Sequence, residues 1–348
     1  MPVPRVPSTP AASGRPRVVL AMDPQFADGF FDDRARARFA EIAVWDPALI
    51  VHDLDDRRAA AELRDAEVMF ASWGAPVLDE ELLAAAPALK AVVYAAGSVK
   101  GLVTEACWRR GLTVSSGAWA NALPVAEYTV AAILLANKQI PQIREEFRRV
   151  RGTRHAWRHS YPDIGNYRRT VGIVGASLIG RRVIELLRPH DLAVVVHDPY
   201  LDPQAAGELG VRTAALDELC AVSDVVSLHA PQLPATEGMI GARQLALMRD
   251  GATLVNTARG ALVDTAALVP EVTLGRLNAV LDVTDPDPLP AGSPLYDLPN
   301  VTLTPHVAGS MGNEHYRLAH SALDELARYA AGRPFRHEVR PDRLDRIA

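Results

Sequence analysis

The chain has 348 residues, 49% of them hydrophobic and 23% charged, and its formal net charge is −5. These values are ordinary for a soluble globular protein, and the length suits two domains. The acidic balance gives no reason to expect nucleic acid as a partner. A membrane partner is not expected either, because the longest apolar candidate, residues 130–136, is far shorter than the roughly 18 residues that a span requires.

The first 16 residues, MPVPRVPSTPAASGRP, are rich in proline, serine and alanine and predict a disordered tail. They lack the apolar core that a signal peptide needs. The two cysteines, Cys107 and Cys220, are too few for a disulfide framework. Together these features predict a cytoplasmic protein, and we expect no bound metal.

Residues 17–118 alternate short apolar runs with segments of helical composition. The expected strands are 17–22, 67–71, 90–94 and 112–115, and the expected helices between them are 32–42, 79–86 and 104–110. Alternation of this kind predicts a parallel sheet with helices on both faces. Ala96, Gly97 and Ser98 follow the third strand, at the edge where open α/β sheets bind ligands. On local evidence alone, an ordinary strand-to-helix loop is the safer interpretation.

Residues 123–150 form the longest uninterrupted helical pattern, apolar in its first half and charged in its second. Asn121 is placed to cap this helix, Pro124 suits its first turn, and Pro141 is expected to kink it. A long helix that enters a second α/β series predicts the connection between two domains.

Residues 170–198, TVGIVGASLIGRRVIELLRPHDLAVVVHD, predict a βαβ unit with a dinucleotide-binding turn. Gly175 allows the chain to turn sharply out of the first strand, and Gly180 allows the helix to pack close to the sheet. The helix start between them, at Leu178 and Ile179, offers free N–H groups and the positive end of a dipole to a pyrophosphate.

The middle glycine of the usual G-x-G-x-x-G pattern is Ser177 in this chain. Its Cβ is expected to crowd the phosphates, although its hydroxyl is able to donate to a phosphate oxygen. The alternative is an ordinary tight turn of a doubly wound sheet. The dinucleotide interpretation is favoured because strand, turn, helix, strand and acid follow one another in the right order.

Five polar or charged residues follow predicted strands of this second series. The strands after residue 198 are 224–229, 252–256, 277–283 and 301–304, and the five residues are Asp198, His229, Arg259, Asp287 and His306. Because the carboxyl ends of parallel strands meet at one edge of a sheet, this convergence predicts an active site there. Asp198 is the acid expected to bind the adenosine ribose. A last helix, 314–331, follows after this sheet is complete.

Six motifs give the sequence a specific resemblance to the D-isomer-specific 2-hydroxyacid dehydrogenases, over most of its length. They are VGIVGASLIG, the acid in HDPY, SLHAPQLPAT, LVNTARGALVD, LDVTDPDP and LTPHVAGS. The resemblance implies two doubly wound parallel-sheet α/β domains, with a Rossmann NAD domain (121–311) inserted into a split flavodoxin-like substrate domain (17–120 and 312–348). It also implies NAD as the cofactor and a homodimer. Because the chain ends soon after the last helix, we expect no appended regulatory domain.

The resemblance also implies roles for individual residues. Arg259 resembles the arginine that binds the substrate carboxylate and polarises its carbonyl, and His306 resembles the general acid. Asp287 stands where the family usually has the glutamate that pairs with this histidine, so its reach is one methylene shorter. The loop of Ala96, Gly97 and Ser98 matches the one that holds the substrate carboxylate. The residues expected to bind the cofactor are Gly175, Ser177, Leu178, Ile179, Gly180, Asp198, His229, Pro231, Thr236, Thr257, Ala258 and Asp282, the last near the nicotinamide carboxamide.

These observations predict an NAD-dependent oxidoreductase that interconverts a small 2-oxoacid and its D-2-hydroxyacid. A non-catalytic, dinucleotide-sensing corepressor of the same fold and a phosphite-type dehydrogenase are the alternatives. Arg259 and His306 with an acid partner favour the enzyme. The carboxylate at position 287 argues against the formate-oxidising relatives, for which the family pattern implies an amide there.

Overall fold

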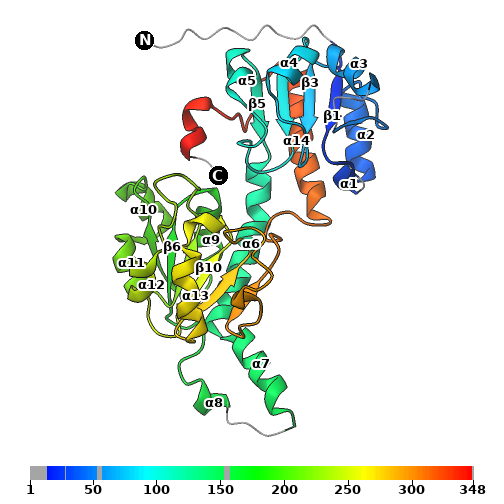
Figure 1. Cartoon of the computed structure of the whole chain (residues 1–348). Coiled ribbons are helices and arrows are strands. Elements are labelled where there is room, and N and C mark those ends of the chain that lie inside the picture. The colour runs from blue at the N-terminus through cyan, green and yellow to red at the C-terminus, as the bar shows by residue number, and fades with distance from the viewer. Residues whose placement is uncertain (1–13, 28, 53–56, 153–156, 347–348) are drawn as a thin grey trace. The chain divides into compact units, whose positions relative to one another are not determined.

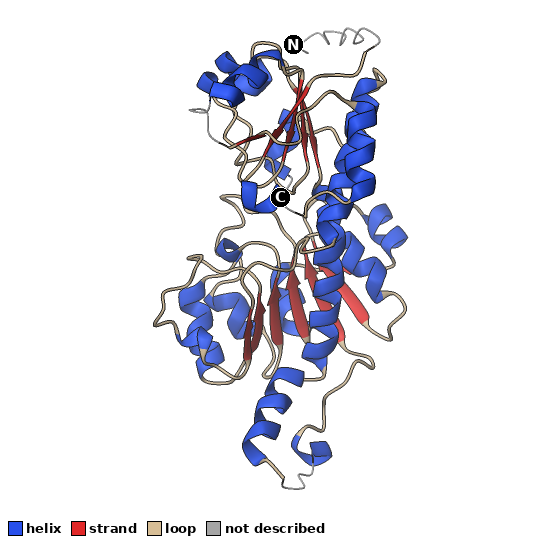
Figure 2. Ribbon diagram, turned by 90° about the vertical axis from the view of Figure 1, so that its right-hand side faces the viewer, coloured by secondary structure: helices blue, strands red, loops and turns tan. Residues whose placement is uncertain are grey.

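The computed structural model describes residues 14–27, 29–52, 57–152 and 157–346, so the predicted tail of residues 1–16 lies almost wholly outside the described residues. The chain divides into two compact units: unit 1 consists of residues 1–121 and 310–346, and unit 2 of residues 122–309. Each unit is built on its own parallel sheet surrounded by helices (Figures 1 and 2), which confirms the predicted α/β fold class.

The sheet of unit 1 has the strand order β2-β1-β3-β4-β5. Its strands are β1 Val18–Ala21, β2 Ile50–Val51, β3 Val68–Ala71, β4 Ala91–Tyr94 and β5 Thr113–Ser116. Its helices are α1 Pro24–Ala27, α2 Asp33–Ile42, α3 Arg57–Asp65, α4 Glu80–Ala85, α5 Glu105–Arg109 and α14 Glu314–Ala330. Leu318, Leu323 and Leu326 on α14 are buried in the same hydrophobic core as Phe39 of α2 and Val93 of β4. The last helix of the chain therefore completes the core of the first unit.

The sheet of unit 2 has the strand order β12-β11-β10-β9-β6-β7-β8, and all of its strand pairs are parallel. The strands are β6 Thr170–Val174, β7 Ala193–His197, β8 Arg212–Thr213, β9 Val225–Leu228, β10 Thr253–Asn256, β11 Asn278–Leu281 and β12 Val301–Leu303. The order reverses between β6 and β9. Doubly wound sheets bind ligands outside the carboxyl ends of their strands at such a reversal.

Helices cover both faces of this second sheet. The covering helices are α6 Ala118–Asn137, α9 Leu178–Leu187, α10 Pro203–Leu209, α11 Leu216–Val222, α12 Ala242–Leu247 and α13 Thr265–Thr273. The unit also contains α7 Ile140–Val150, none of whose residues is buried, and α8 Trp157–Ser160. Alternate residues of β9 face opposite cores: Leu228 packs in one core with Leu268 of α13, and Val225 packs in the other with Ile133 of α6 and Val183 of α9. Burial on both faces explains the continuous apolar runs of these strands.

The predicted single helix over residues 123–150 is wrong, because two helices occupy this stretch. α6 begins earlier, at Ala118, so that Pro124 lies inside it, and Asn121 accepts a hydrogen bond from the Ser310 N–H (2.9 Å) instead of capping it. α6 ends at Asn137, four residues before Pro141, whose ring would clash with that carbonyl in a continuous helix. The chain breaks at Gln139, in the left-handed region (φ 48°), and Pro141 suits the first turn of α7.

Among the described residues, α6 alone has the length and apolar composition of a membrane span. Half of its most apolar window is buried inside the protein. Its residues belong to hydrophobic cores: Ala120 to that of unit 1, and Ala126 and Ile133 to one of unit 2. Burial of this kind is typical of a helix in the core of a globular protein.

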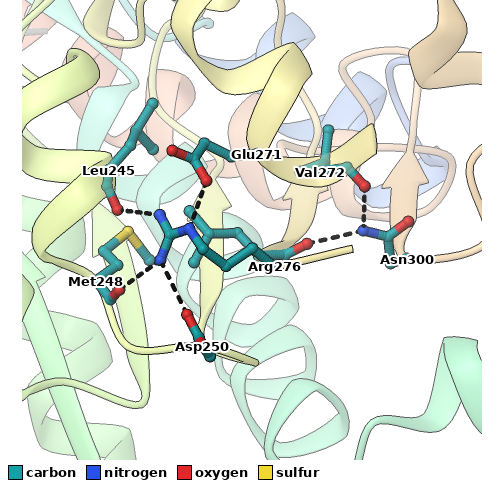
Figure 3. A network of polar contacts seen from close by, with 8 residues as sticks. Leu245, Met248, Asp250, Glu271, Val272, Arg276 and Asn300 are labelled. Carbon is teal, nitrogen blue, oxygen red and sulfur yellow. Dashed lines mark hydrogen bonds and ion pairs between the residues drawn. The ribbon is translucent and has the colours of Figure 1, made fainter. Parts of the chain in front are cut away.

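A network around Arg276 closes the amino-terminal edge of the second sheet (Figure 3). The guanidinium donates to the carbonyl oxygens of Leu245 (2.6 Å) and Met248 (2.7 Å), at the end of α12, and to the carboxylate of Glu271. It also lies 3.5 Å from the carboxylate of Asp250. A cation that bonds the last carbonyls of a helix satisfies acceptors with no partner inside the helix and complements the helix dipole.

Candidate active site

The turn after β6 has the close backbone packing that the glycine pattern predicts. Gly175 has a φ of 98°, and a Cβ on it would lie 2.6 Å from the backbone nitrogen of Ala230, beyond the end of β9. A Cβ on Gly180 would lie 2.0 Å from the carbonyl oxygen of Gly175. No side chain fits either position, so both glycines are required to bring α9 and β9 against the turn.

Ser177 is the N-cap of α9, which explains why a serine is tolerated at this position. Its φ of −67° needs no glycine, and its hydroxyl accepts a hydrogen bond from the Gly180 N–H (3.3 Å). The N–H groups of Leu178 and Ile179, the first two residues of α9, have no acceptor within a helix. They are the donors that remain for an anion at this helix start.

Asp198 joins the end of β7 to the same turn. One of its carboxylate oxygens accepts from the Ala176 N–H (2.7 Å) and the other from the Tyr200 N–H (2.7 Å). A carboxylate has about four acceptor sites, so both oxygens retain capacity for ribose hydroxyls. The turn, the helix start and this half-buried acid together fit the diphosphate and ribose of a dinucleotide.

His229 is buried beside the turn at the end of β9. Its Nε2 lies 2.9 Å from the Ser227 hydroxyl, whereas its Nδ1 has no hydrogen-bond partner among the described residues. Burial lowers the pKa of His229 to about 3, so its ring is neutral at physiological pH. In the loop that follows, the Thr236 hydroxyl donates to the carbonyl of Pro231 (2.6 Å) and accepts from the Leu233 N–H (2.9 Å), which closes the loop.

Arg259 follows β10 on a loop held by its neighbours. The amide of Asn256 donates to the Arg259 carbonyl (2.8 Å) and accepts from the Ala258 N–H (3.1 Å). The hydroxyl of Thr257 lies 2.8 Å from that of Thr129 on α6. A Cβ on Gly260 would lie 2.0 Å from the carbonyl oxygen of Thr284, so the chain passes close to the loop after β11.

The guanidinium of Arg259 is half-buried and has no counter-ion among the described residues. It donates to the carbonyl of Ala258 (2.6 Å), and no ion pair to it occurs in the described part of the chain. Burial lowers the pKa of Arg259 from its ordinary value. A desolvated cation whose remaining N–H groups lack a carboxylate is a site for an anion from outside the protein.

Asp282 is buried (1% exposed) and organises the loop that carries His306. Its Oδ1 accepts from the Thr304 hydroxyl (2.6 Å) and the Val307 N–H (2.9 Å), and its Oδ2 accepts from the Ala308 N–H (2.9 Å). The His306 N–H donates to the Asp282 carbonyl (2.9 Å), and His306 adopts a left-handed φ of 56°. Asp282 therefore fixes the backbone on both sides of His306.

Tyr128 of α6 extends this network and lies outside the six family motifs. Its hydroxyl lies 2.9 Å from the Thr304 hydroxyl, whose proton is already donated to Asp282, so Tyr128 is the donor. Burial and the charge of Asp282 raise the pKa of Tyr128, against the effect of the Thr304 hydrogen bond. The hydroxyl thus stays protonated. The only sequence signal was a polar residue in the apolar half of a helix.

The side chains of Asp287 and His306 are both exposed, and the structure does not bring them together. Within the described residues, no hydrogen bond or ion pair joins them. Asp287 lines a cavity of about 940 Å³ with Thr284, Thr304 and Pro305. Their pairing stays a prediction.

The predicted substrate loop lies in unit 1, after β4. The Ser116 hydroxyl donates to the carbonyl of Gly97 (2.6 Å), and the Ser72 hydroxyl donates to the carbonyl of Ala95 (3.1 Å). These two bonds fix the loop backbone of residues 95–98 from the neighbouring strands β5 and β3. A backbone held in this way is preorganised to offer N–H groups to an anion.

Comparisons with known proteins give the same family as the motifs. The model of the D-isomer specific 2-hydroxyacid dehydrogenase, NAD binding domain, matches residues 130–308. A D-3-phosphoglycerate dehydrogenase of Mycobacterium bovis is 35% identical over 260 residues, which are 74% of this chain and 48% of the relative. The chain thus spans about half the length of the phosphoglycerate dehydrogenases that it matches. A glyoxylate reductase of Aeropyrum pernix is 32% identical over 74% of this chain and 78% of its own.

Solved structures with the same fold cover nearly the whole chain. A protein from Thermus thermophilus is 30% identical, with a TM-score of 0.73 over 93% of this chain and 100% of its own. A D-isomer specific 2-hydroxyacid dehydrogenase from Lactobacillus delbrueckii, in its NAD-complexed form, is 22% identical, with a TM-score of 0.77 over 93% of this chain and 100% of its own, and shows the fold. The chain therefore belongs to the D-isomer specific 2-hydroxyacid dehydrogenase family, and unit 2 contains its NAD-binding domain.

Proposed function

We propose that the protein reduces a small 2-oxoacid to its D-2-hydroxyacid with NADH, or catalyses the reverse oxidation. The observation that carries this proposal is Arg259 at the carboxyl edge of the NAD-binding unit, a half-buried guanidinium that has no carboxylate partner in the part of the chain that the structure describes. A planar guanidinium binds a carboxylate through two parallel hydrogen bonds and stabilises negative charge on the adjacent carbonyl oxygen. The names of the relatives, phosphoglycerate dehydrogenase and glyoxylate reductase, support a 2-oxoacid substrate.

His306 is proposed to supply the proton of this reaction. NADH, when bound, provides the hydride, and an imidazolium gives a proton to the carbonyl oxygen. The exposed position of His306 and its fixed backbone suit a group that must reach a substrate. Asp287 is proposed to stabilise the imidazolium, and the loop of Ala96, Gly97 and Ser98 to hold the substrate carboxylate.

Asp198 is proposed to favour NADH over NADPH. The 2′-phosphate of NADPH would meet a carboxylate that already accepts two backbone hydrogen bonds, and no basic residue directly follows it. Repulsion between these like charges would weaken the binding of NADPH. Turnover with NADPH equal to that with NADH at matched concentrations would contradict this assignment.

A homodimer and a cytoplasmic location also stay predictions. α7 presents Ile140, Ile143 and Val150 at helical spacing, and none of its residues is buried. Such an apolar stripe suits contact with a second copy. Cys107 and Cys220 are both free and buried, as expected in a reducing compartment. Sedimentation at micromolar protein concentration tests this prediction, and a monomer at that concentration would contradict the homodimer.

A panel of 2-oxoacids tests the proposed reaction. Glyoxylate, hydroxypyruvate, pyruvate and larger 2-oxoacids are each incubated with NADH, and the chirality of the product is determined by chiral chromatography. The expected result is consumption of NADH with a D-2-hydroxyacid, or glycolate from glyoxylate, as product. Binding of NADH without turnover of any 2-oxoacid would favour the dinucleotide-sensing alternative. Reduction of NAD by phosphite would favour the phosphite dehydrogenase.

A further inference from the structure

The two carboxylate oxygens of Asp282 accept different numbers of hydrogen bonds from the protein. Oδ1 accepts two hydrogen bonds, from the Thr304 hydroxyl and the Val307 N–H, whereas Oδ2 accepts one, from the Ala308 N–H. The Asp282 side chain is 1% exposed, and no cation pairs with it in the described part of the chain. A buried carboxylate without a cation needs its acceptor sites filled by donors, and the site with room for one is on Oδ2.

One of the hydrogen bonds to Oδ1 is the end of a chain of donors that begins at Tyr128 on α6. Thr304 gives its proton to Asp282, so it is able only to accept from Tyr128, and Tyr128 gives its proton to Thr304. Successive hydrogen bonds of this kind polarise one another and hold the carboxylate in one rotation about its axis. If the Thr304 donor were lost, Oδ1 would keep one bond and the two oxygens would become equivalent.

We propose that Thr304 and Tyr128 are positioning residues that present the Oδ2 atom of Asp282 to an amide donor, the carboxamide of the nicotinamide ring. This inference rests on the NAD-linked function proposed above. The chain Tyr128–Thr304–Asp282 fixes which oxygen faces the ligand and so fixes the rotation of the ring. Neither hydroxyl touches the cofactor; both act through Asp282.

Binding of two ligands separates this role from a general effect on the fold. NADH carries the carboxamide, and ADP-ribose shares its adenosine and diphosphate but lacks the nicotinamide ring. Thr304→Val keeps the shape of the side chain and removes the donor. We expect the Kd of NADH to rise about tenfold and the Kd of ADP-ribose to stay within about twofold, as loss of one hydrogen bond to a charged group predicts.

A control variant and the order of the hydrogen bonds from Tyr128 to Asp282 make the test more specific. Thr302, two residues earlier, is half-buried, and its hydroxyl forms no hydrogen bond among the described residues, so Thr302→Val should change neither Kd. Thr304→Ser keeps the donor and should restore NADH binding. Tyr128→Phe should weaken NADH binding by a smaller factor, and it should add nothing in the Thr304→Val background, because Tyr128 acts through Thr304.

Four outcomes would overturn the proposal. The first is an equal rise of both dissociation constants in Thr304→Val, which would mean that the residue only supports the fold. The second is an unchanged Kd of NADH in both Thr304→Val and Tyr128→Phe. The third is a Tyr128→Phe effect that adds fully to that of Thr304→Val. If the unaltered protein binds ADP-ribose and NADH equally, Asp282 does not contact the ring, whatever reaction the protein catalyses.

Discussion

Two arginines of unit 2 lie at opposite edges of one sheet and have opposite surroundings. Arg276, at the amino-terminal edge, bonds two carbonyls and the carboxylate of Glu271, and lies near that of Asp250 (Figure 3). Arg259, at the carboxyl edge, bonds one backbone carbonyl and has no carboxylate partner in the described part of the chain. The hydrogen bond with Glu271 raises the pKa of Arg276, and burial lowers that of Arg259.

The difference separates an arginine that holds the fold together from one available to a ligand. The carbonyls and the carboxylate around Arg276 satisfy its guanidinium, so these hydrogen bonds stabilise the folded protein. Arg259 is partly desolvated without that compensation, which is the arrangement expected of a cation that binds the proposed substrate anion. A half-buried cation on a fixed loop with few hydrogen-bond partners is therefore a better indication of a ligand-binding site than its charge alone.

Replacement of Arg259 by lysine should have the largest effect on activity. Lysine keeps the charge but loses the planar fork, so kcat/KM for 2-oxoacid reduction should fall about 100-fold or more. The Kd of NADH should change little, because the substrate carboxylate is the expected partner. Steady-state rates and NADH fluorescence measure the two quantities. A loss of activity explained wholly by weaker NADH binding would place Arg259 outside the substrate site.

Replacement of Arg276 by methionine should give the reverse pattern. The carbonyls at the end of α12 and the carboxylate of Glu271 lose their donors, so the free energy of unfolding should fall by about 2 kcal/mol. The Kd of NADH and kcat/KM should stay unchanged at temperatures where the variant is folded. Urea unfolding monitored by circular dichroism measures the loss. An active-site defect without loss of stability would break the contrast between the two edges.

His229 adds a pH dependence to the carboxyl edge. Its pKa in the folded protein is about 3 and that of an unfolded histidine about 6.5, so the unfolded chain binds the proton first. The stability that its neutral form contributes is present above pH 6.5 and lost as the pH falls toward 3. At pH 5 this loss amounts to about 2 kcal/mol relative to pH 7.

His229→Gln should remove this pH dependence. The glutamine does not titrate, so the difference in unfolding free energy between pH 7 and pH 5 should be smaller by about 2 kcal/mol than in the unaltered protein. The exposed His52 provides a control for the loss of one histidine, and the effect of His229→Gln should exceed that of His52→Gln. Urea unfolding at pH 7, 6 and 5 makes the comparison. If the unfolding free energy changed equally with pH in the unaltered protein and in both variants, His229 would not titrate in this way.

Asp287→Asn should have the smallest effect, on the pH profile of the rate. If the carboxylate stabilises the His306 imidazolium in the working enzyme, its removal should move the alkaline limb of kcat/KM about one pH unit lower. Asp287→Glu restores the usual family residue and should keep the limb in place. A substrate that does not titrate in this range is required. An asparagine variant with an unmoved limb would show that Asp287 only supports its proline-rich turn.

The sequence predicted the fold class and the strand ends that carry polar groups, because buried parallel strands leave long apolar runs. It missed β2 and β8, since Ile50–Val51 and Arg212–Thr213 are too short to show any periodicity. The break between α6 and α7 follows from Pro141, but the left-handed conformation of Gln139 does not show in its residue type.

Within the candidate site, local patterns predicted single residues and not their partners. Ser177 was expected to crowd the phosphates, and the structure makes it the cap of α9. Tyr128 and Thr304 are 176 residues apart in the chain, and only the fold brings their hydroxyls together. The motifs carry the residues proposed to contact ligands, whereas the hydrogen bonds that position these residues are set by tertiary packing.

The late position of α14 has a consequence for synthesis on the ribosome. Leu318, Leu323 and Leu326 complete the core of unit 1, yet they are translated after the whole of unit 2. The core that they share with α2 and β4 is therefore incomplete in the nascent chain until the last helix emerges. Unit 2 is contiguous in sequence, so it is able to fold first, although it comes second. Transiently exposed apolar surface of this kind makes a growing chain prone to aggregation until its last helix has docked.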